Sequence, residues 1–415
     1  MNKETYYAAF APGNSPHTSP CISYGLPYTV ACVKHVTETF HAKRIYILAS
    51  GSLSSNTDAL SNLEGALHSN LDEIAVVGVK KGIRPHSFYS DILNIVREAK
   101  SAEADCLVTL GAGSLTDAAK VVSIALANDA NTVDELETLY FDSPTLRSPV
   151  VPAKVPIFCV PTSLSAGEFT YNAGATNDDT HHKHSFRHLS MGPRLVIFDP
   201  ELSKTTPERI WLSTGLKAVD HCIEAICSIK ASPEGDQLGE SGLRKLLPGL
   251  LKTKASPEQV EPRLQCQLGA VDAISTVLLG IPLGASHGIG HQLGPLGVGH
   301  GETSCILLPS VCKWNAPVNG AQQQKVLDIL WTEPSISDVL EKETLDRGKA
   351  DLGDVLHALF VELGMPRSLK EVGIGRERLP GLAIGSLSDR WCKTNPKPLT
   401  GKEHVMEILE MVVGD

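Results

Sequence analysis

Short apolar runs alternate with amphipathic stretches in the first half of the chain. Five runs have the length and composition of buried strands, at residues 44–49, 74–79, 106–110, 157–160 and 195–198. Helical periodicity lies between them, through Leu60 and Leu67, from Ser90 to Ala102 and up to Lys120. Strands that alternate with helices predict a mostly parallel sheet covered on both faces, with ligands at the carboxyl ends of its strands.

The pattern changes after residue 200. Strand-like runs mostly disappear, and helical periodicity dominates from Pro207 onward. Two polar stretches, at residues 232–235 and 332–334, are typical of loops. We therefore expect two domains, an α/β domain over residues 1–200 and an all-α domain over residues 201–415.

Composition narrows the class of protein. A hydrophobic content of 42% and a charged content of 20% are ordinary for a soluble globular protein. The net charge of −10 argues against binding to nucleic acid or to an anionic membrane. The chain has no apolar run long enough to span a bilayer, no apolar signal segment, and ten cysteines without a C-x-x-C pair. We expect a reduced, cytoplasmic protein.

Histidines supply the strongest chemical signal. His287 and His291 stand four residues apart, so they share one face of a helix, and His300 follows soon after. His221 lies in an earlier apolar stretch, and Lys217 stands four residues before it. Imidazole is a common metal ligand and proton carrier, whereas an ammonium cannot ligate a cation and repels one. The pattern predicts a histidine-lined pocket and makes a metal in it doubtful.

A glycine-containing loop joins the third strand to its helix. Its sequence over residues 110–120 is LGAGSLTDAAK. Glycines let a backbone approach a pyrophosphate, and the start of the helix attracts the anion. Ser114 could cap that helix or touch a phosphate. The loop is neither a G-x-G-x-x-G fingerprint nor a Walker loop, so an ordinary strand-to-helix turn stays an alternative.

Taken together, five segments resemble the iron-containing alcohol dehydrogenase family, within the dehydroquinate-synthase-like superfamily. Residues 111–120 resemble its phosphate motif G-G-G-S-x-x-D-x-x-K, with alanine for the middle glycine. Residues 161–170 resemble its P-T-T segment, at the length found in the maleylacetate reductase branch. The other matches are G-M-D-A-x-x-H at residues 215–221, the histidine block at residues 287–315 and the closing N-P-R-P motif at residues 395–398.

The resemblance implies that the N-terminal domain binds a nicotinamide dinucleotide. The pyrophosphate would be held by Gly111, Ala112, Gly113 and Ser114, with Asp117 in the following helical turn. The dinucleotide cleft would be lined by Thr162, Ser163 and Thr170, with Lys183 near the ribose. For the threonines and serines, the alternative is ordinary hydrogen bonding within loops.

The residue after the first predicted strand bears on the choice of cofactor. Many relatives carry an aspartate there, which would bind the adenosine ribose hydroxyl and repel a phosphate. Here Ser50 takes its place. A small neutral side chain removes that repulsion, so the sequence favours NADPH over NADH.

The family also implies a metal. In its metal-dependent members an aspartate and three histidines hold iron or zinc, which polarises the substrate carbonyl. The histidines map to His221, His287 and His300, but the aspartate maps to Lys217. Asp220 is a poor substitute because on a helix it would point about 100° away from His221. Residues 292–299 are one fewer than in the family, so the aim of His300 is open.

The maleylacetate branch likewise lacks the aspartate and is understood to work without metal. Our hypothesis is that Lys217 supplies the positive charge that stabilises the developing oxyanion during hydride transfer. His221, His287 or His300 would orient the substrate and donate a proton, and His291 would lie close to the nicotinamide. The alternatives are a Lys217 that points to solvent or pairs with a carboxylate, and histidines that are structural. The histidines of residues 181–184 are interpreted as part of a solvated loop.

These residues predict a metal-independent, NAD(P)H-dependent reductase of a small carbonyl or conjugated carbonyl compound. One alternative is a metal-dependent alcohol or aldehyde dehydrogenase that keeps His221, His287 and His300 as ligands. The other is a non-redox lyase or cyclase that uses the histidine–lysine pocket. Maleylacetate itself is disfavoured because the histidine block contributes no arginine for its second carboxylate. Relatives suggest a homodimer, and we expect no nucleic-acid or membrane partner.

Overall fold

The computed structural model describes residues 3–9, 19–69, 74–111 and 113–414. By its internal contacts the chain divides into two compact units, Met1–Thr205 and Thr206–Asp415. Among the described residues, every helix is too short or too polar to cross a membrane.

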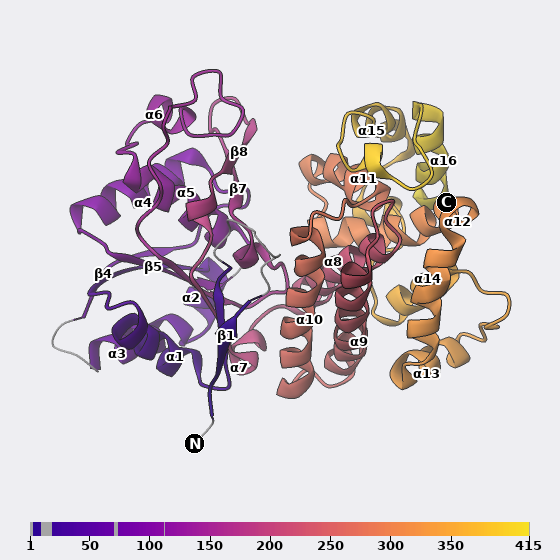
Figure 1. The fold of residues 1–415 in the computed structure, drawn as a ribbon, viewed down its shortest axis with the longest axis horizontal. Helices are drawn as coiled ribbons and strands as arrows, with labels where there is room; N and C mark the ends of the chain where they lie inside the picture. The colour runs from indigo at the N-terminus through magenta and orange to yellow at the C-terminus, as the bar shows by residue number, and fades with distance from the viewer. Residues whose placement is uncertain (1–2, 10–18, 70–73, 112, 415) are drawn as a thin grey trace. The chain divides into compact units, whose positions relative to one another are not determined.

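The first unit is built on a seven-stranded sheet (Figure 1). Its strands run in the order β1 (Thr5–Ala8), β2 (Cys21–Tyr24), β9 (Leu195–Phe198), β6 (Ile157–Pro161), β5 (Cys106–Gly111), β3 (Arg44–Ala49) and β4 (Ala75–Lys81). Strand β1 pairs antiparallel with β2, and the other neighbours pair in parallel. The predicted mostly parallel sheet is confirmed, as are the five predicted strands.

Four further strands were not predicted. Strands β1 and β2 are four residues each and add to one edge of the sheet. Strands β7 (Asn172–Thr176) and β8 (Lys183–Arg187) form a separate antiparallel pair. The solvated-loop interpretation of residues 181–184 is therefore wrong in part, because β8 begins at Lys183 and His184 packs on Tyr140 with ring centroids 4.2 Å apart.

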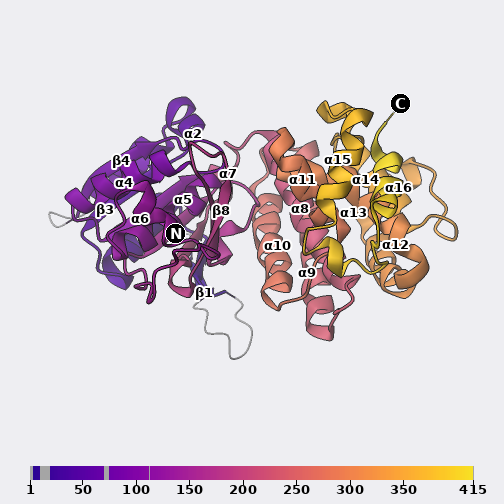
Figure 2. The ribbon, with the colours of Figure 1, turned by 90° about the horizontal axis from the view of Figure 1, so that it is seen from above.

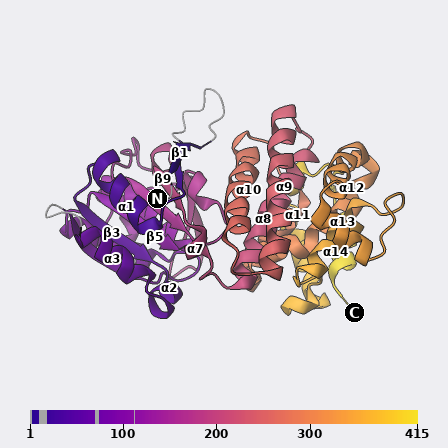
Figure 3. The ribbon, with the colours of Figure 1, turned by 90° about the horizontal axis from the view of Figure 1, so that it is seen from below.

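Helices cover both faces of this sheet. Helices α1 (Tyr28–Lys34) and α3 (Ala59–Ser69) lie on one face, and α4 (Tyr89–Ser101) and α5 (Ser114–Ala127) lie on the other (Figures 1 and 3). Strand residues that point to the first face, such as Ile45 and Ile47, share one apolar core with α1 and α3. The intervening Tyr46 and Leu48 are also fully buried, which explains why these strands are continuous apolar runs.

The second unit is helical. Its long helices α8 (Glu208–Ile226), α9 (Pro233–Ala255) and α10 (Val260–Leu278) pack side by side (Figure 2). Helix α12 (His300–Trp331) packs on α8, α11 (Ala285–Leu293), α14 (Leu352–Glu362) and α16 (Lys402–Val412), and α15 (Leu379–Ser386) packs on α11 and α16. The predicted helical character of the second half is confirmed.

The two stretches predicted as loops are loops only up to their prolines: Ser232, Thr332 and Glu333 lie outside helices, and a helix begins at the proline that follows. Helix α9 begins at Pro233, one residue after Ser232, whose hydroxyl accepts a hydrogen bond from the Gly235 N–H at 3.1 Å. Helix α13 (Pro334–Lys342) likewise begins at a proline. Proline suits the first position of a helix because that N–H has no partner within the helix, so both prolines start a helix rather than interrupt one.

Candidate active site

The carboxyl ends of three parallel strands meet at the glycine loop of the first unit. The Ser50 N–H donates to the Leu110 carbonyl at 2.9 Å, and the Thr162 N–H donates to the Gly111 carbonyl at 3.2 Å. The structure therefore brings together Ser50, Gly111 and Thr162, as the dinucleotide prediction requires.

Both loop glycines are demanded by the backbone. Gly111 has a φ of 139° and Gly113 a φ of 56°, which residues with a side chain rarely adopt. A Cβ on Gly111 would also lie 2.9 Å from the Cβ of Ser50. Ala112, the third predicted pyrophosphate residue of this loop, lies outside the described residues.

The start of helix α5 is not capped by a side chain. Gly113 is its N-cap, and Ser114 is its first helical residue, so the suggested capping role of Ser114 is wrong. The N–H groups of the first turn of α5 carry a positive partial charge, which suits a pyrophosphate. Asp117 in the same turn accepts a hydrogen bond from the Gly174 N–H of β7 at 3.3 Å.

A buried lysine that we did not predict as a site residue holds Thr170 in place. The Lys120 ammonium is fully buried and donates to the Gly167 carbonyl (2.6 Å), the Thr170 hydroxyl (3.0 Å) and the Asn172 carbonyl (3.0 Å). Burial lowers the pKa of Lys120, while Asp117 and Glu168 act in the opposite direction. Lys120 thus ties the segment around Thr170 to α5; the D-x-x-K spacing was the available signal.

The remaining dinucleotide candidates lie apart from this contact set. The Ser163 hydroxyl bonds to the Ser165 hydroxyl at 2.8 Å, which is the local loop bonding considered as the alternative. Lys183 is exposed at the start of β8, where its side chain runs past Gly174.

In the second unit, three helices bring the four predicted histidines together. His221 comes from α8, His287 and His291 from α11, and His300 from α12. Ring centroids are 4.7 Å apart for His221 and His287, 5.9 Å for His287 and His300, and 5.5 Å for His291 and His300. The shorter segment before His300 still lets its ring join the cluster.

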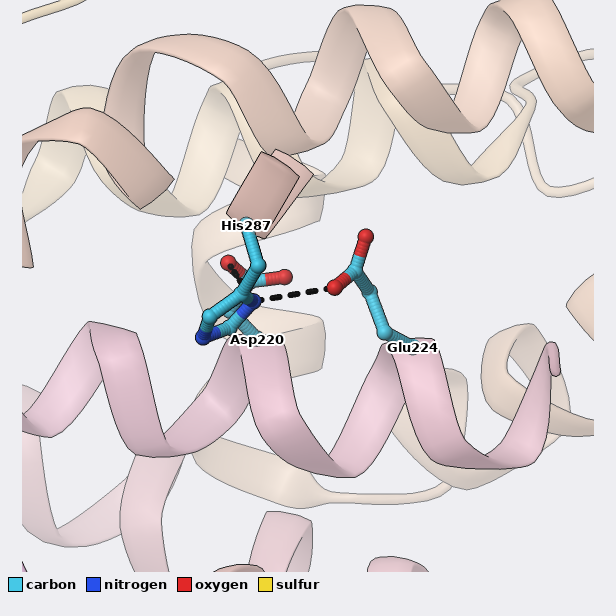
Figure 4. A group of neighbouring side chains, drawn as sticks. All are labelled: Asp220, Glu224 and His287. Atoms are coloured by element: carbon cyan, nitrogen blue, oxygen red, sulfur yellow. Dashed lines mark hydrogen bonds and ion pairs between the residues drawn. The ribbon is translucent and has the colours of Figure 1, made fainter. Parts of the chain in front are cut away.

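Two carboxylates hold one nitrogen of His287 (Figure 4). Its Nδ1 lies 2.9 Å from Glu224 Oε2 and 3.3 Å from Asp220 Oδ2, and these acids stand one turn apart on α8. Asp220 therefore contacts the same ring on which His221 stacks. With Nδ1–H donating to Glu224, Nε2 of His287 presents its lone pair. Two nitrogens of the cluster, Nε2 of His287 and Nδ1 of His221, are buried and have no hydrogen-bond partner among the described residues.

Burial makes this cluster chemically unusual. Burial and the neighbouring Glu224 together raise the pKa of Asp220 to about 7. Burial raises the pKa of Glu224 to about 7 as well. Burial also lowers the pKa of His287 to about 4 and that of His221 well below its ordinary value. The charge of half-buried Lys217 lowers both histidine pKa values as well, so its ammonium lies near their rings.

The same atoms test the fit of a metal ion. Asp220, Glu224 and His287 have ligand atoms within 4.8 Å of one another, but Nδ1 of His287 is already bonded to Glu224. The family-like set of His221, His287 and His300 offers two buried, unbonded nitrogens. Lys217 stands at the sequence position that the resemblance gives to the fourth ligand, and an ammonium cannot ligate a cation.

A second histidine–carboxylate pair was missed at the sequence level. Nδ1 of His291 lies 2.8 Å from Asp389 Oδ2, and Asp389 stands in a turn after α15. Glu224 was missed too, although a carboxylate inside the apolar stretch around His221 was a usable signal. Asp389 had none, because an acid in a polar turn is ordinary.

The closing motif fixes the start of α11. Asn395 Oδ1 accepts hydrogen bonds from the Ala285 N–H and from Asn315 Nδ2, both at 3.1 Å. Asn395 Nδ2 donates in return to Asn315 Oδ1 at 2.8 Å. These buried amides anchor the helix that carries His287 and His291.

Comparison with known proteins agrees over nearly the whole chain. The family described as iron-containing alcohol dehydrogenase matches residues 27–200, and the C-terminal part of that family matches residues 211–413. Dehydrogenase FUM7 of Gibberella moniliformis is 38% identical, over 97% of this chain and 98% of its own. Dehydrogenase ALT3 of Alternaria alternata is 38% identical, over 89% and 99%.

A solved structure shares the fold. The crystal structure of maleylacetate reductase from Rhizobium sp. strain MTP-10005 superimposes with a TM-score of 0.73. It is 22% identical and covers 99% of this chain and 98% of its own. The similarity therefore extends through both units.

Replacing Lys120 with methionine should destabilise the first unit. The change leaves two buried carbonyls and the Thr170 hydroxyl without their donor, which costs about 2–4 kcal/mol of unfolding free energy. Thermal unfolding followed by circular dichroism measures the loss. Lys100→Met is the control, since Lys100 is exposed and pairs only at the surface with Asp129. Equal melting temperatures for the two variants would contradict the anchoring role.

Replacing Glu224 with glutamine should stabilise the protein more at high pH than at low pH. The folded-state pKa of Glu224 is raised from 4.5 to about 7, so its protonated form is favoured on folding. The resulting stability is present below pH 4.5 and is lost as pH rises through about 7. We expect the unfolding free energy of E224Q relative to that of wild type to rise by about 1–3 kcal/mol between a pH of about 5 and one of about 8, whatever the cost of the exchanged hydrogen bond.

The control for this comparison is Glu407→Gln, at an exposed position on α16. Melting temperatures of wild type and both variants are compared across the pH range. A difference between E224Q and wild type that does not change with pH would show that Glu224 is not a proton-binding group of the folded state.

Proposed function

The chain belongs to the iron-containing alcohol dehydrogenase family, and we propose that it reduces a small carbonyl or conjugated carbonyl compound with NADPH, without a metal ion. Its family and its dehydrogenase relatives make it a dehydrogenase or reductase. The observation that carries the finer proposal is Lys217, whose charge acts on His221 and His287 where the family places a carboxylate ligand.

The first unit supports the dinucleotide. Strand ends at Ser50, Gly111 and Thr162 converge, and the glycine-bounded start of α5 offers N–H groups to a pyrophosphate. A bound reduced nicotinamide supplies the hydride that the carbonyl carbon receives. Thr170, held by Lys120, would complete the site from the adjoining segment.

In the second unit, Lys217 stabilises the oxygen that gains negative charge as the carbonyl carbon is reduced. His221 and His287 have low pKa values and stay neutral near pH 7, so they orient the substrate through hydrogen bonds. Glu224 fixes the His287 ring through Nδ1. An ammonium therefore does the electrostatic work that a metal ion does in other carbonyl-reducing sites.

One observation favours a metal-dependent alcohol or aldehyde dehydrogenase as the second candidate. His221 Nδ1 and His287 Nε2 are buried and lack hydrogen-bond partners among the described residues, as ligand nitrogens would. The proposal without metal satisfies these atoms with water, or, at the His287 Nε2 lone pair, with a hydroxyl of the substrate that donates to it. We rank the non-redox alternative below both of these, because the relatives that match most of this chain are dehydrogenases.

The substrate class follows from the charges of the cluster. Lys217 suits one anionic or strongly polarised oxygen, and a dicarboxylate such as maleylacetate would need a further cation. We therefore propose a neutral or singly charged carbonyl compound. A cytoplasmic homodimer without nucleic-acid or membrane partners completes the proposal, in keeping with the net charge of −10.

Removing the Lys217 charge tests the proposal. We expect wild type to purify without stoichiometric iron or zinc, and Lys217→Ala to lose about 100-fold in kcat, because one oxyanion-stabilising group is worth that much. Lys217→Asp should gain metal while losing activity. Elemental analysis and carbonyl-dependent oxidation of NADPH measure these effects.

Lys252→Asp, at an exposed lysine of α9, is the matched control and should change neither metal content nor activity. Stoichiometric metal in wild type, with activity that a chelator abolishes, would favour the metal-dependent dehydrogenase. Unchanged turnover in Lys217→Ala would remove the lysine from the mechanism.

The residue at position 50 should set the choice of dinucleotide. Ser50 carries no charge, and Lys81, at the end of β4 beside the Ser50 turn, has no ion pair among the described residues. We expect Ser50→Asp to weaken NADPH binding at least about 10-fold and NADH binding far less, through repulsion of the 2′-phosphate. Nicotinamide fluorescence measures both affinities.

Ser55→Asp, at an exposed position of α2 (Gly51–Asn56), is the control for the added charge. Equal losses of NADPH affinity in the two variants would indicate a general charge effect. A wild type that prefers NADH would show that Ser50 does not select the phosphate.

A further inference from the structure

His291 is the member of the α11 histidine pair that solvent reaches. Its side chain is 37% exposed, whereas that of His287, one turn earlier, is 4% exposed. His221 is 6% exposed. A proton that enters the cluster from water therefore meets His291, or the exposed His300 stacked on it, before it meets His221 or His287.

Asp389 fixes the orientation of the His291 ring. Oδ2 of Asp389 lies 2.8 Å from His291 Nδ1, while Oδ1 accepts the Trp391 N–H at 2.8 Å. The Asp389 N–H in turn donates to the Ser386 carbonyl at 3.0 Å. The carboxylate is thus held by its own turn on one side and by the imidazole on the other.

The turn that carries Asp389 is packed directly on α11. A Cβ on Gly288 would lie 2.5 Å from Cys392 Sγ and 2.7 Å from the Cys392 nitrogen, so only a glycine allows this approach. Gly288 is three residues before His291 on the same helix. The absence of a side chain there brings Asp389 within reach of the His291 ring.

The carboxylate stays ionised beside His291. Burial raises the pKa of Asp389, but hydrogen bonds from His291 and from the Trp391 N–H outweigh it, so this pKa lies below its ordinary value. An ionised acceptor at Nδ1 keeps a proton on Nδ1 and leaves Nε2 to exchange its own proton. The other ring in contact is His300, stacked at 5.5 Å and 16°.

We propose that Asp389 is a positioning residue that holds His291 as the proton donor to the reduced carbonyl oxygen. The inference rests on the proposed reductase function. The carbonyl carbon receives the hydride, and the oxygen takes the proton from Nε2 of the His291 imidazolium. The N–H bond at Nε2 breaks and an O–H bond forms. The ring, now neutral, keeps its proton on Nδ1, where it is hydrogen-bonded to Asp389. Water then restores the proton at Nε2 through the exposed side of the ring.

The division of labour differs from the one read from sequence. His221 and His287 orient the substrate, Lys217 stabilises charge on the oxygen, and His291 delivers the proton. Asp389 does not touch the substrate in this scheme. Its effect on turnover should therefore pass entirely through His291.

A double-mutant cycle tests this dependence. We expect Asp389→Asn to lower kcat about 10- to 100-fold, the size of effect typical for a group that orients a reacting ligand, with KM values changed less than about 3-fold. His291→Ala should lower kcat at least as much. Adding Asp389→Asn to His291→Ala should cause no further loss, because the positioned group is already gone.

Controls separate positioning from folding. Asp338→Asn, at an exposed position of α13, is the matched substitution and should leave kcat unchanged. Melting temperature and dinucleotide affinity are measured for each variant. Should Asp389→Asn fail to fold, Asp389→Glu keeps the charge, displaces the ring and completes the same cycle.

A spectroscopic readout addresses the ring itself. In wild type labelled with nitrogen-15 histidine, the neutral His291 ring should carry its proton on Nδ1, and Asp389→Asn should redistribute that proton between the two nitrogens. A purely structural Asp389 would leave this signal unchanged.

Two outcomes would overturn the inference, and they are distinguishable from failure of the function. Losses from Asp389→Asn and His291→Ala that multiply in the double variant, in an enzyme that reduces carbonyls, overturn the inference alone. So does a His291→Ala variant with full kcat, which transfers the donor role to His300. If the wild type fails to oxidise NADPH with any carbonyl compound tested, the proposed function is overturned, and this inference with it.

Discussion

The histidine pocket depends on one buried carboxylate. Glu224 accepts hydrogen bonds from the Ser286 N–H at 3.0 Å and from Nδ1 of His287, so a single side chain of α8 holds both the start of α11 and its first histidine. Burying such a group is costly unless its oxygens are bonded, and here they are. Removing these bonds would weaken the hold on the helix start and on the ring together, leaving them to Asn395 and Asp220, so the geometry of the site depends on the packing of the second unit.

Helical spacing then arranges the charges around that contact. Lys217 and His221 stand four residues apart on α8, and so do Asp220 and Glu224, so each pair shares one side of the helix. The acids face His287, and the ammonium acts on the two buried rings. One helix thus supplies both the cation of the pocket and the carboxylates that orient its histidine.

Parts of this arrangement were readable from sequence because they depend on local pattern. Continuous apolar runs predicted five strands; β3, β5, β6 and β9 are buried on both faces and so have no polar alternation, whereas the edge strand β4 is half-buried. Strands β1 and β2 are short, and β7 and β8 carry polar or exposed residues, so pattern alone did not reveal them. The four histidines stood out as a rare residue type in a block that resembles a known family.

The carboxylates were not readable in the same way. Glu224 and His287 are 63 residues apart, and Asp389 and His291 are 98 apart, so only the tertiary packing of α11 brings them together. The role of Gly288 could not be predicted from sequence either, although its lack of a side chain lets the turn that carries Asp389 pack against α11. Hydrophobic periodicity describes one helix or strand at a time, so it cannot predict contacts between residues on distant elements.

The ammonium of Lys217 gives the pocket a consistent electrostatic logic. Burial lowers the pKa of His221 and His287, and the charge of Lys217 lowers both further, so both rings stay neutral; the same charge opposes a divalent cation near them. Neutral rings can orient a carbonyl, but they have no cationic proton to give. In our proposal, proton delivery then falls to a ring that solvent reaches and that a carboxylate orients. His291, which is partly exposed and bonded to Asp389, meets both conditions, so in our proposal Lys217 on α8 and the His291–Asp389 pair have complementary roles.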